Sequence, residues 1–213
     1  ILTKARAELW EEIDVDDFDA FWSDSELIRY INYAQKEFSR ITLSIPDYSD
    51  ISLVALTNEY AYPTEVIQIY GGHLQTLNKR VKPRSIEDFE RGWMLNGETI
   101  ETQGNWENDY GTPRFIITNK RVNYLQVWPT PISDETLRLY VYRYSNDVDQ
   151  ATDLMEIQNE EVEGVLFKVK SLALAKQDPD SMNMERSMLF GQKWASFIQD
   201  MKATYDRRYN RRG

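Results

Sequence analysis

The sequence contains no cysteine and a single histidine, His73, among its 213 residues. Without thiols the chain can form no disulfide, iron–sulfur cluster or cysteine-based zinc site, and it has no cysteine nucleophile. One imidazole also excludes every site that needs two, including the HExxH zinc motif. No apolar run approaches the ~18 residues that predict a membrane span. Because Ile1 and Leu2 lead directly into Lys4 and Arg6, we also expect no signal peptide.

Catalytic signatures are missing as well. Gly71-Gly72 lacks the lysine and the following helix that a phosphate-binding loop needs. The acidic run at residues 14–19 lacks the glycine and the terminal glutamate of a calcium-binding loop, and no Gly-x-Ser-x-Gly elbow accompanies His73. We therefore predict that the protein is not an enzyme and binds no cofactor. Neither the acidic run nor His73 is expected to act as a metal or catalytic site.

The charge is unevenly distributed along an acidic chain. The net charge is −10, yet residues 202–213 hold five basic residues and one acid, Asp206. An acidic body disfavours general nucleic-acid binding, which depends on clustered cations. Arginine and tyrosine together suit carboxylates and interface pockets, so the end of the chain is predicted to be mobile until it docks to a protein rather than to DNA. The docking residues would be Arg207, Arg208, Tyr209, Arg211 and Arg212.

Three segments repeat apolar residues at the spacing of an amphipathic helix. Their stripes are Leu27, Ile31, Ala34, Phe38 and Ile41; Val162, Leu166, Val169 and Ala173; and Phe190, Trp194, Phe197, Met201 and Tyr205. A capping-box pattern at residues 23–26 predicts the start of the first of these helices. A shorter helix is expected earlier, at residues 3–13.

Between residues 46 and 150 the apolar period changes to two, which is typical of β-strands. Residues 65–70 are predicted to form a strand that ends in a turn at Gly71-Gly72. Residues 115–118 and 122–128 are predicted to pair as a hairpin. The order of helix, strands and two helices therefore predicts an α+β fold. Residues 1–45 and 151–213 would form a small helical bundle, with residues 46–150 inserted as an antiparallel β-sheet or sandwich.

Tyrosine and tryptophan are abundant, at thirteen and six residues. Tyr140, Tyr142 and Tyr144 alternate with apolar residues on one strand, and Trp93, Trp106 and Tyr110 lie in a polar, glycine-containing stretch typical of a partner-facing loop. These six residues are candidates for contact with neighbouring subunits or a tail protein, because interfaces are enriched in Tyr and Trp. The tyrosine strip also resembles a sugar-stacking surface. The alternative is therefore a carbohydrate-binding or tail-fibre-like module.

Four segments, in order, carry a resemblance to a known family. Residues 27–37 read Leu-Ile-Arg-Tyr-Ile-Asn-Tyr-Ala-Gln-Lys-Glu, which resembles the opening helix of bacteriophage head-to-tail adaptor (connector) proteins. Residues 62–74 are similar to their segment of Pro, strand, Gly turn and Leu. Residues 111–143 resemble their Gly-x-Pro, strand, Pro-x-Pro, strand stretch. The last two helices, with Asp178-Pro179 between them, also fit.

The resemblance implies a structural virion protein in the neck, between the capsid portal and the tail, assembled in the cytoplasm of the host bacterium. Members of that family form an oligomeric ring, commonly a dodecamer, beneath the portal protein. The ring extends the DNA channel, helps to retain the genome and attaches a tail or nozzle protein, while DNA passes through the lumen without sequence-specific contacts. A C-terminal extension often reaches into the portal, and the arginine-rich end corresponds to it here.

Overall fold

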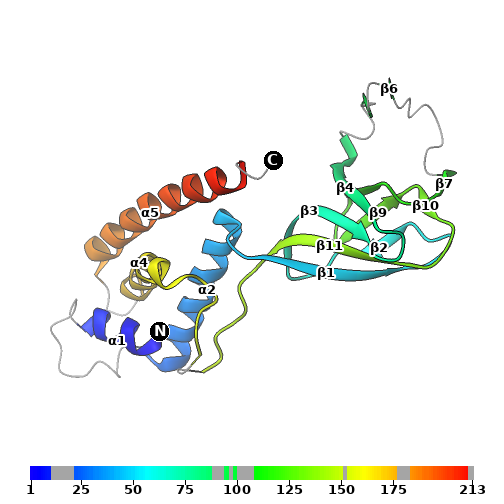
Figure 1. Cartoon of the computed structure of the whole chain (residues 1–213). Helices are drawn as coiled ribbons and strands as arrows, with labels where there is room; N and C mark the ends of the chain where they lie inside the picture. Colours follow the sequence, from blue (N-terminus) through cyan, green and yellow to red (C-terminus); the bar gives the residue numbers. More distant parts are fainter. Residues whose placement is uncertain are drawn as a thin grey trace. The chain divides into compact units, whose positions relative to one another are not determined.

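The computed structural model describes residues 1–10, 22–87, 94–95, 98–99, 108–150, 153–176 and 183–210. The chain divides into two compact units. The helical unit combines residues 1–45 with residues 144–213, and the sheet unit comprises residues 46–143. Figure 1 shows the helices of the first unit in blue and in yellow to red, because both ends of the chain build it.

The helical unit contains α1 (Leu2–Trp10), α2 (Asp24–Thr42), α4 (Asn159–Leu174) and α5 (Met184–Asn210). The predicted capping box is present, since the Ser23 hydroxyl accepts the N–H of Glu26 and the Glu26 carboxylate accepts the N–H of Ser23. Two N–H groups that have no partner inside the helix are satisfied in this way. The three predicted amphipathic helices are confirmed. α1 ends at Trp10, and residues 11–13 of the expected first helix lie outside the described residues.

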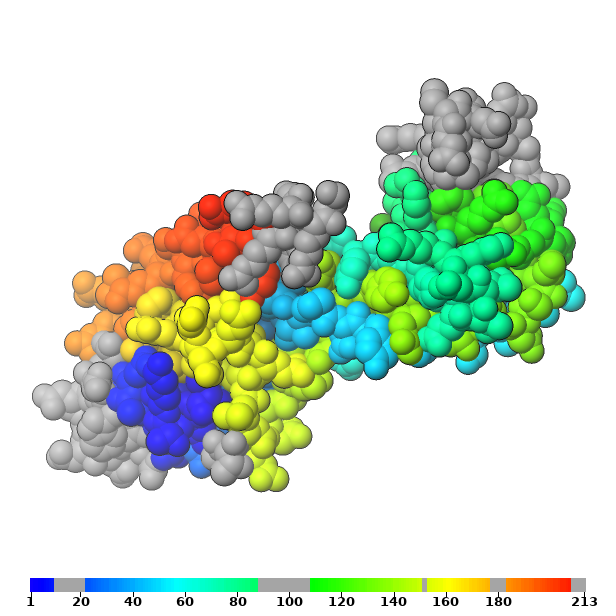
Figure 2. Space-filling view, viewed as in Figure 1, coloured from blue at the N-terminus to red at the C-terminus, as the bar shows by residue number. Residues whose placement is uncertain are grey.

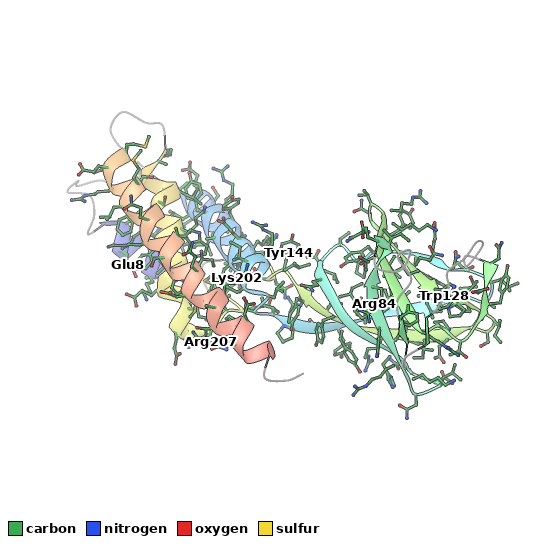
Figure 3. The ribbon with its side chains drawn as sticks, turned by 90° about the horizontal axis from the view of Figure 1, so that it is seen from above. Glu8, Arg84, Trp128, Tyr144, Lys202 and Arg207 are labelled. Carbon is green, nitrogen blue, oxygen red and sulfur yellow. The ribbon has the colours of Figure 1, made fainter. Side chains whose placement is uncertain are left out.

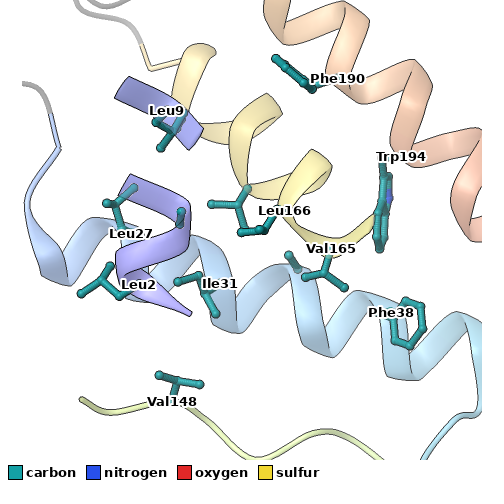
Figure 4. Packing of buried hydrophobic residues seen from close by; sticks show 14 of the residues in the cluster. Leu2, Leu9, Leu27, Ile31, Phe38, Val148, Val165, Leu166, Phe190 and Trp194 are labelled. Atoms are coloured by element: carbon teal, nitrogen blue, oxygen red, sulfur yellow. The ribbon is translucent and has the colours of Figure 1, made fainter. Parts of the chain in front are cut away.

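One buried core joins all four helices. It includes Leu2, Leu9, Trp22, Leu27, Ile31, Phe38, Val165, Leu166, Phe190 and Trp194. Figure 4 labels all of these except Trp22 and shows them converging between the helices. The ring centroid of Phe38 lies 6.5 Å from that of Trp194 and 6.0 Å from that of Phe197. The buried Trp22 indole donates its N–H to the carbonyl of Ala173 at 3.0 Å, so no polar atom of that side chain is left unsatisfied.

The sheet unit is built on one seven-stranded sheet in the order β1-β11-β3-β4-β8-β9-β2. Its strands are β1 (Pro46–Leu53), β2 (Glu59–Ala61), β3 (Val66–Leu74), β4 (Lys79–Ser85), β8 (Phe115–Arg121), β9 (Tyr124–Trp128) and β11 (Glu135–Arg143). Two small pairs are also present: β5 (Met94–Leu95) with β6 (Glu98–Thr99), and β7 (Tyr110–Gly111) with β10 (Thr130–Pro131). The α+β class is therefore confirmed.

The sheet is mixed rather than antiparallel, which corrects the expectation from sequence. β4 and β8 are parallel, with Lys82 opposite Phe115, and β7 and β10 are also parallel. Parallel strands need a long connection, and residues 86–114 supply one between β4 and β8. Alternation within a strand reports which side chains share a face, but it carries no information on the direction of the neighbouring strand.

The predicted turn at Gly71-Gly72 is wrong, because both glycines lie inside β3. The chain turns after Leu74, where Asn78 has a left-handed backbone with φ of 51°. A Cβ at Gly72 would approach Ile116 Cδ1 to 2.8 Å. This glycine therefore makes room for a packed core side chain and does not form a turn. The predicted hairpin is confirmed by the antiparallel pairing of β8 and β9.

Candidate interaction surfaces

The outer face of the sheet, opposite its aliphatic core, carries a cluster of tyrosines. Tyr48 of β1 pairs with Tyr140 of β11, and Tyr140 pairs with Gly71 of β3. Residues paired in this way project from the same face. A register shift after Tyr140 leaves Tyr70 as an extra residue beside Gly71, which is the arrangement of a β-bulge. The ring centroid of Tyr70 lies 6.1 Å from that of Tyr140 and 4.7 Å from that of Tyr142.

Three of these rings are open to solvent, and the fourth, that of Tyr142, is buried. The exposed fractions are 60% for Tyr48, 45% for Tyr70 and 37% for Tyr140, against 8% for Tyr142. A Cβ at Gly71 would lie 3.3 Å from the Tyr140 ring, so the missing side chain lets that ring approach the neighbouring strand. We refer to these four tyrosines as the tyrosine face.

Charged residues lie beside the tyrosine face in the next row of the sheet. Asp50 pairs with Arg138, and Arg138 pairs with His73. Arg138 donates from Nε and Nη2 to the two oxygens of Asp50, both at 2.8 Å, and these bonds hold the pKa of Asp50 below its ordinary value. The Arg138 guanidinium also lies 4.4 Å from the centre of the Tyr48 ring. It therefore contacts an aromatic face and a carboxylate together.

The predicted contact residues occupy different surroundings. Tyr140 is exposed, Tyr142 shares its face but is covered, and Tyr144 follows the end of β11 and is half-buried. Tyr110, in β7, is 60% exposed. Trp93 and Trp106 lie outside the described residues. The structure thus brings Tyr140 and Tyr142 together.

Sequence reasoning missed two members of the tyrosine face, Tyr48 and Tyr70. Tyr48 is on a strand far from β11 in sequence, and only the pairing of β1 with β11 brings it beside Tyr140. Tyr70 reaches the face through the bulge in β3. The period-two pattern of residues 46–53 was the one local signal that could have pointed to Tyr48.

The arginine-rich end is helical for longer than expected. α5 continues to Asn210, so Arg207, Arg208 and Tyr209 belong to the helix and not to a free tail. Arg207 Nε donates to the carbonyl of Ala203 at 3.0 Å, and cations near a helix C-terminus are favoured by the helix dipole. Figure 3 shows Arg207 near the end of α5, beyond Lys202. Arg211 and Arg212 lie outside the described residues.

The polar residues of the family-like Ile-Asn-x-Ala-Gln sequence hold an extended segment of the chain. Asn32 Nδ2 donates to the carbonyl of Val148 at 2.9 Å, and the N–H of Val148 donates back to Asn32 Oδ1 at 2.8 Å. Gln35 Nε2 donates to the carbonyl of Asn146 at 2.6 Å. Lys36 forms an ion pair with Asp147 at 2.7 Å. This part of the sequence pattern therefore anchors residues 146–148 on α2.

Two kinds of feature are absent from the described part of the chain. No group of three or more His, Asp or Glu side chains there could hold a metal ion, and the acidic run at residues 14–19 lies outside it. His73 Nε2 lies 2.9 Å from Asn78 Oδ1, next to the β3–β4 turn. Among the described helices, none has the length and apolar character needed to cross a membrane.

The sequence was also compared with known proteins and protein families. No protein with a curated description matches it. A family model described as SU10 adaptor protein matches residues 1–213, which is the whole sequence. A match of that extent covers both units and all of the interaction surfaces described above. The chain belongs to the SU10 adaptor protein family.

Proposed function

We propose that the protein is a structural component of a phage particle, a head-to-tail adaptor that forms a ring beneath the portal. The observation that carries the proposal is the family match over residues 1–213. In this role the ring extends the DNA channel, helps to retain the genome and provides the attachment site of the tail. The role requires no catalytic step.

The distribution of charge and aromatic residues supports this role. The net charge of −10 repels DNA phosphates, so a channel lined by this chain would let the duplex slide. The tyrosine face, with Arg138 beside it, has the Tyr and Arg composition of an interface hot spot. We assign this face to contact with a neighbouring subunit or a tail protein.

The basic end is proposed to dock to the portal protein. Arg207, Arg208 and Tyr209 extend α5 beyond Tyr205, the last buried residue of its stripe. Folding of the helical core therefore does not require them. Several arginines docked together in an acidic groove can form bidentate pairs with carboxylates, whereas one exposed ion pair contributes little.

The test is co-sedimentation with the portal protein of the same phage, combined with electron microscopy of the complex. The wild-type chain should add a ring to the portal. Replacing Arg207, Arg208, Arg211 and Arg212 by Ser should abolish co-sedimentation and leave the helical circular-dichroism signal unchanged, while Lys202→Ser serves as a matched control that still binds. Normal binding by the arginine variant would remove the docking role of the basic end. Absence of any ring with the wild-type chain would contradict the adaptor function itself.

A further inference from the structure

α2 presents a cationic and aromatic stripe to solvent. The positions opposite its buried residues Leu27, Ile31 and Phe38 are Ser25, Arg29, Tyr33, Lys36 and Arg40, which we refer to as the outer stripe of α2. Arg29 and Arg40 are exposed, and Tyr33 has an exposed fraction of 55%. Lys36 is paired with Asp147. Within the described residues, Arg29 and Arg40 have no acidic partner.

α5 presents the opposite charge. Its buried side is narrow, with Ser187, Phe190, Trp194, Ile198 and Tyr205. The positions opposite these, which we refer to as the outer stripe of α5, are all exposed: Glu185, Met188, Leu189, Gln192, Ser196, Gln199, Ala203 and Asp206. Asp200 lies at the edge of this stripe. Figure 2 shows α5, in orange and red, on the surface of the helical unit.

Most cations of α5 lie off the centre of this stripe, but Arg186 lines the same shallow hollow as Glu185. Arg207 lies on the C-terminal end of the stripe, where it donates to the carbonyl of Ala203. Lys193 lies over the rings of Phe167 and Phe190, at 5.7 Å and 4.9 Å from their centres. Within the described residues, neither Glu185 nor Asp200 has a basic partner. Met188 and Leu189 are 61% and 48% exposed, and they line this hollow together with Gln192. Between Glu185 and Asp206 the outer stripe of α5 is therefore acidic and apolar, with Arg207 at its C-terminal end, whereas that of α2 is basic and aromatic.

The two stripes cannot contact each other within one chain. α2 and α5 meet through Phe38, which contacts Trp194 and Phe197. Each outer stripe is on the side of its helix opposite to that contact, so the stripes face away from one another. Complementary surfaces that point in different directions on one unit suit a heterologous contact, which repeats from copy to copy and can close into a ring.

We propose that the outer stripe of α2 binds the outer stripe of α5 on a second copy of this chain. The proposal rests on the proposed ring and specifies its subunit contact. With the two helices parallel, Arg29 and Tyr33 match Glu185 and Leu189, because both pairs are separated by four residues. Arg29 and Arg40 lie about 16 Å apart along the helix axis, and Glu185 and Asp200 about 22 Å. The long arginine side chain can bridge that difference.

The test uses cross-linking, which the absence of cysteine makes specific. Lys36 lies seven residues after Arg29, and Gln192 lies seven residues after Glu185. The substitutions Lys36→Cys and Gln192→Cys should therefore place two thiols next to each other across the contact. A double-cysteine chain treated with a short bis-maleimide should give a ladder of dimers, trimers and higher multimers on denaturing gels. The matched control replaces Gln192→Cys by Lys202→Cys, which lies off the stripe and should give at least tenfold less product.

Charge reversal tests whether the contact is complementary. Arg29→Glu with Arg40→Glu should reduce the ladder about tenfold, and adding Glu185→Lys with Asp200→Lys should restore it. Met188→Ser with Leu189→Ser should reduce it independently of charge. Circular dichroism checks that each variant is folded, and Arg29→Gln with Arg40→Gln replaces the reversal if that variant is not.

Three results would overturn the proposal: no ladder at high protein concentration, a ladder that stops at dimers, or a ladder that charge reversal leaves unchanged. The portal experiment separates this outcome from the adaptor function. A ring of charge-reversed chains on the portal would show that the surfaces are wrong while the function holds. A wild-type chain that never joins the portal would contradict the function, whatever the cross-linking shows.

Discussion

The principal cores of the two units differ in their aromatic content, although Phe115 and Trp128 of the sheet unit are also buried. In the helical unit, Trp22, Phe38, Phe190 and Trp194 are buried in the core. In the sheet unit, the principal core cluster consists of Leu, Val and Ile residues, while Tyr48, Tyr70 and Tyr140 are exposed on the outer face. Large rings buried between helices hold together segments from the two ends of the chain. Rings exposed on a sheet contribute little to folding and leave a surface suited to binding.

The largest expected effect is from Phe38→Ala in the helical core. Phe38 is fully buried and contacts two rings of α5, so its removal should lower the free energy of unfolding by about 3–5 kcal/mol. Urea denaturation followed by far-ultraviolet circular dichroism measures the change. Phe38→Leu keeps most of the volume and should cost about 1 kcal/mol. Equal losses in both variants would show that ring volume does not determine the stability of this core.

A smaller loss is expected where α4 and α5 approach closely. A Cβ at Gly164 would lie 2.1 Å from Phe197 Cζ, so Gly164→Ala forces the ring to move and should cost about 1–3 kcal/mol. Gly191→Ala is the matched control on α5, because its nearest neighbour, Ser171 Oγ, is 3.4 Å away. There the better helix propensity of Ala should leave stability unchanged or raise it by up to about 1 kcal/mol. Thermal melting of the two variants should therefore shift in different directions, and a common shift would contradict the close packing at Gly164.

The structural features that could be predicted from the sequence are those that residues close together in the chain determine. The stripe of α2 and its capping box follow from positions three or four residues apart, so the helix was found with its start. The parallel pairing of β4 with β8 joins strands separated by residues 86–114, and no local pattern contains it. The tyrosine face was found only in part, because Tyr48 and Tyr70 join it through cross-strand pairing and a bulge. Asn32 and Gln35 were visible as a family-like pattern, but their bonds to Val148 and Asn146 depend on the folded chain.

In the sheet unit we expect a pH-dependent loss of stability at Glu135. Its carboxylate accepts the N–H groups of Thr76 and Leu77, at 3.0 and 3.1 Å, in the β3–β4 turn. Burial raises its pKa, but the hydrogen bonds from Thr76, Thr136 and Leu77 outweigh burial, so the pKa is lowered overall. The ionised carboxylate therefore stabilises the fold above about pH 4.3, and this contribution is lost as the pH falls through the pKa of the folded state.

Glu135→Gln removes this charge and should cost about 1–2 kcal/mol at pH 7. The difference from the wild type should shrink as the pH is lowered below about 4, where the native carboxyl is progressively protonated. Urea denaturation across this pH range measures it. Glu65→Gln, at an exposed position of the same unit, should have almost no effect at any pH. A pH-independent loss at Glu135 would show that shape rather than charge holds the turn.

The smallest effect on folding is expected from Tyr48→Thr on the tyrosine face. Tyr48 is 60% exposed, and Thr keeps the preference for a strand, so the main loss is the contact of its ring with Arg138, worth about 0.5–1 kcal/mol at an exposed site. The bidentate pair of Arg138 with Asp50 does not involve the ring and should remain. Urea denaturation should thus differ from the wild type by less than about 1 kcal/mol. A loss as large as that of Phe38→Ala would mean that the exposed tyrosines support the sheet, and the contrast between the two units would not hold. A small loss combined with weaker binding of a tail protein or a neighbouring copy would assign the ring to recognition, because its contribution would then be realised only in the assembled state.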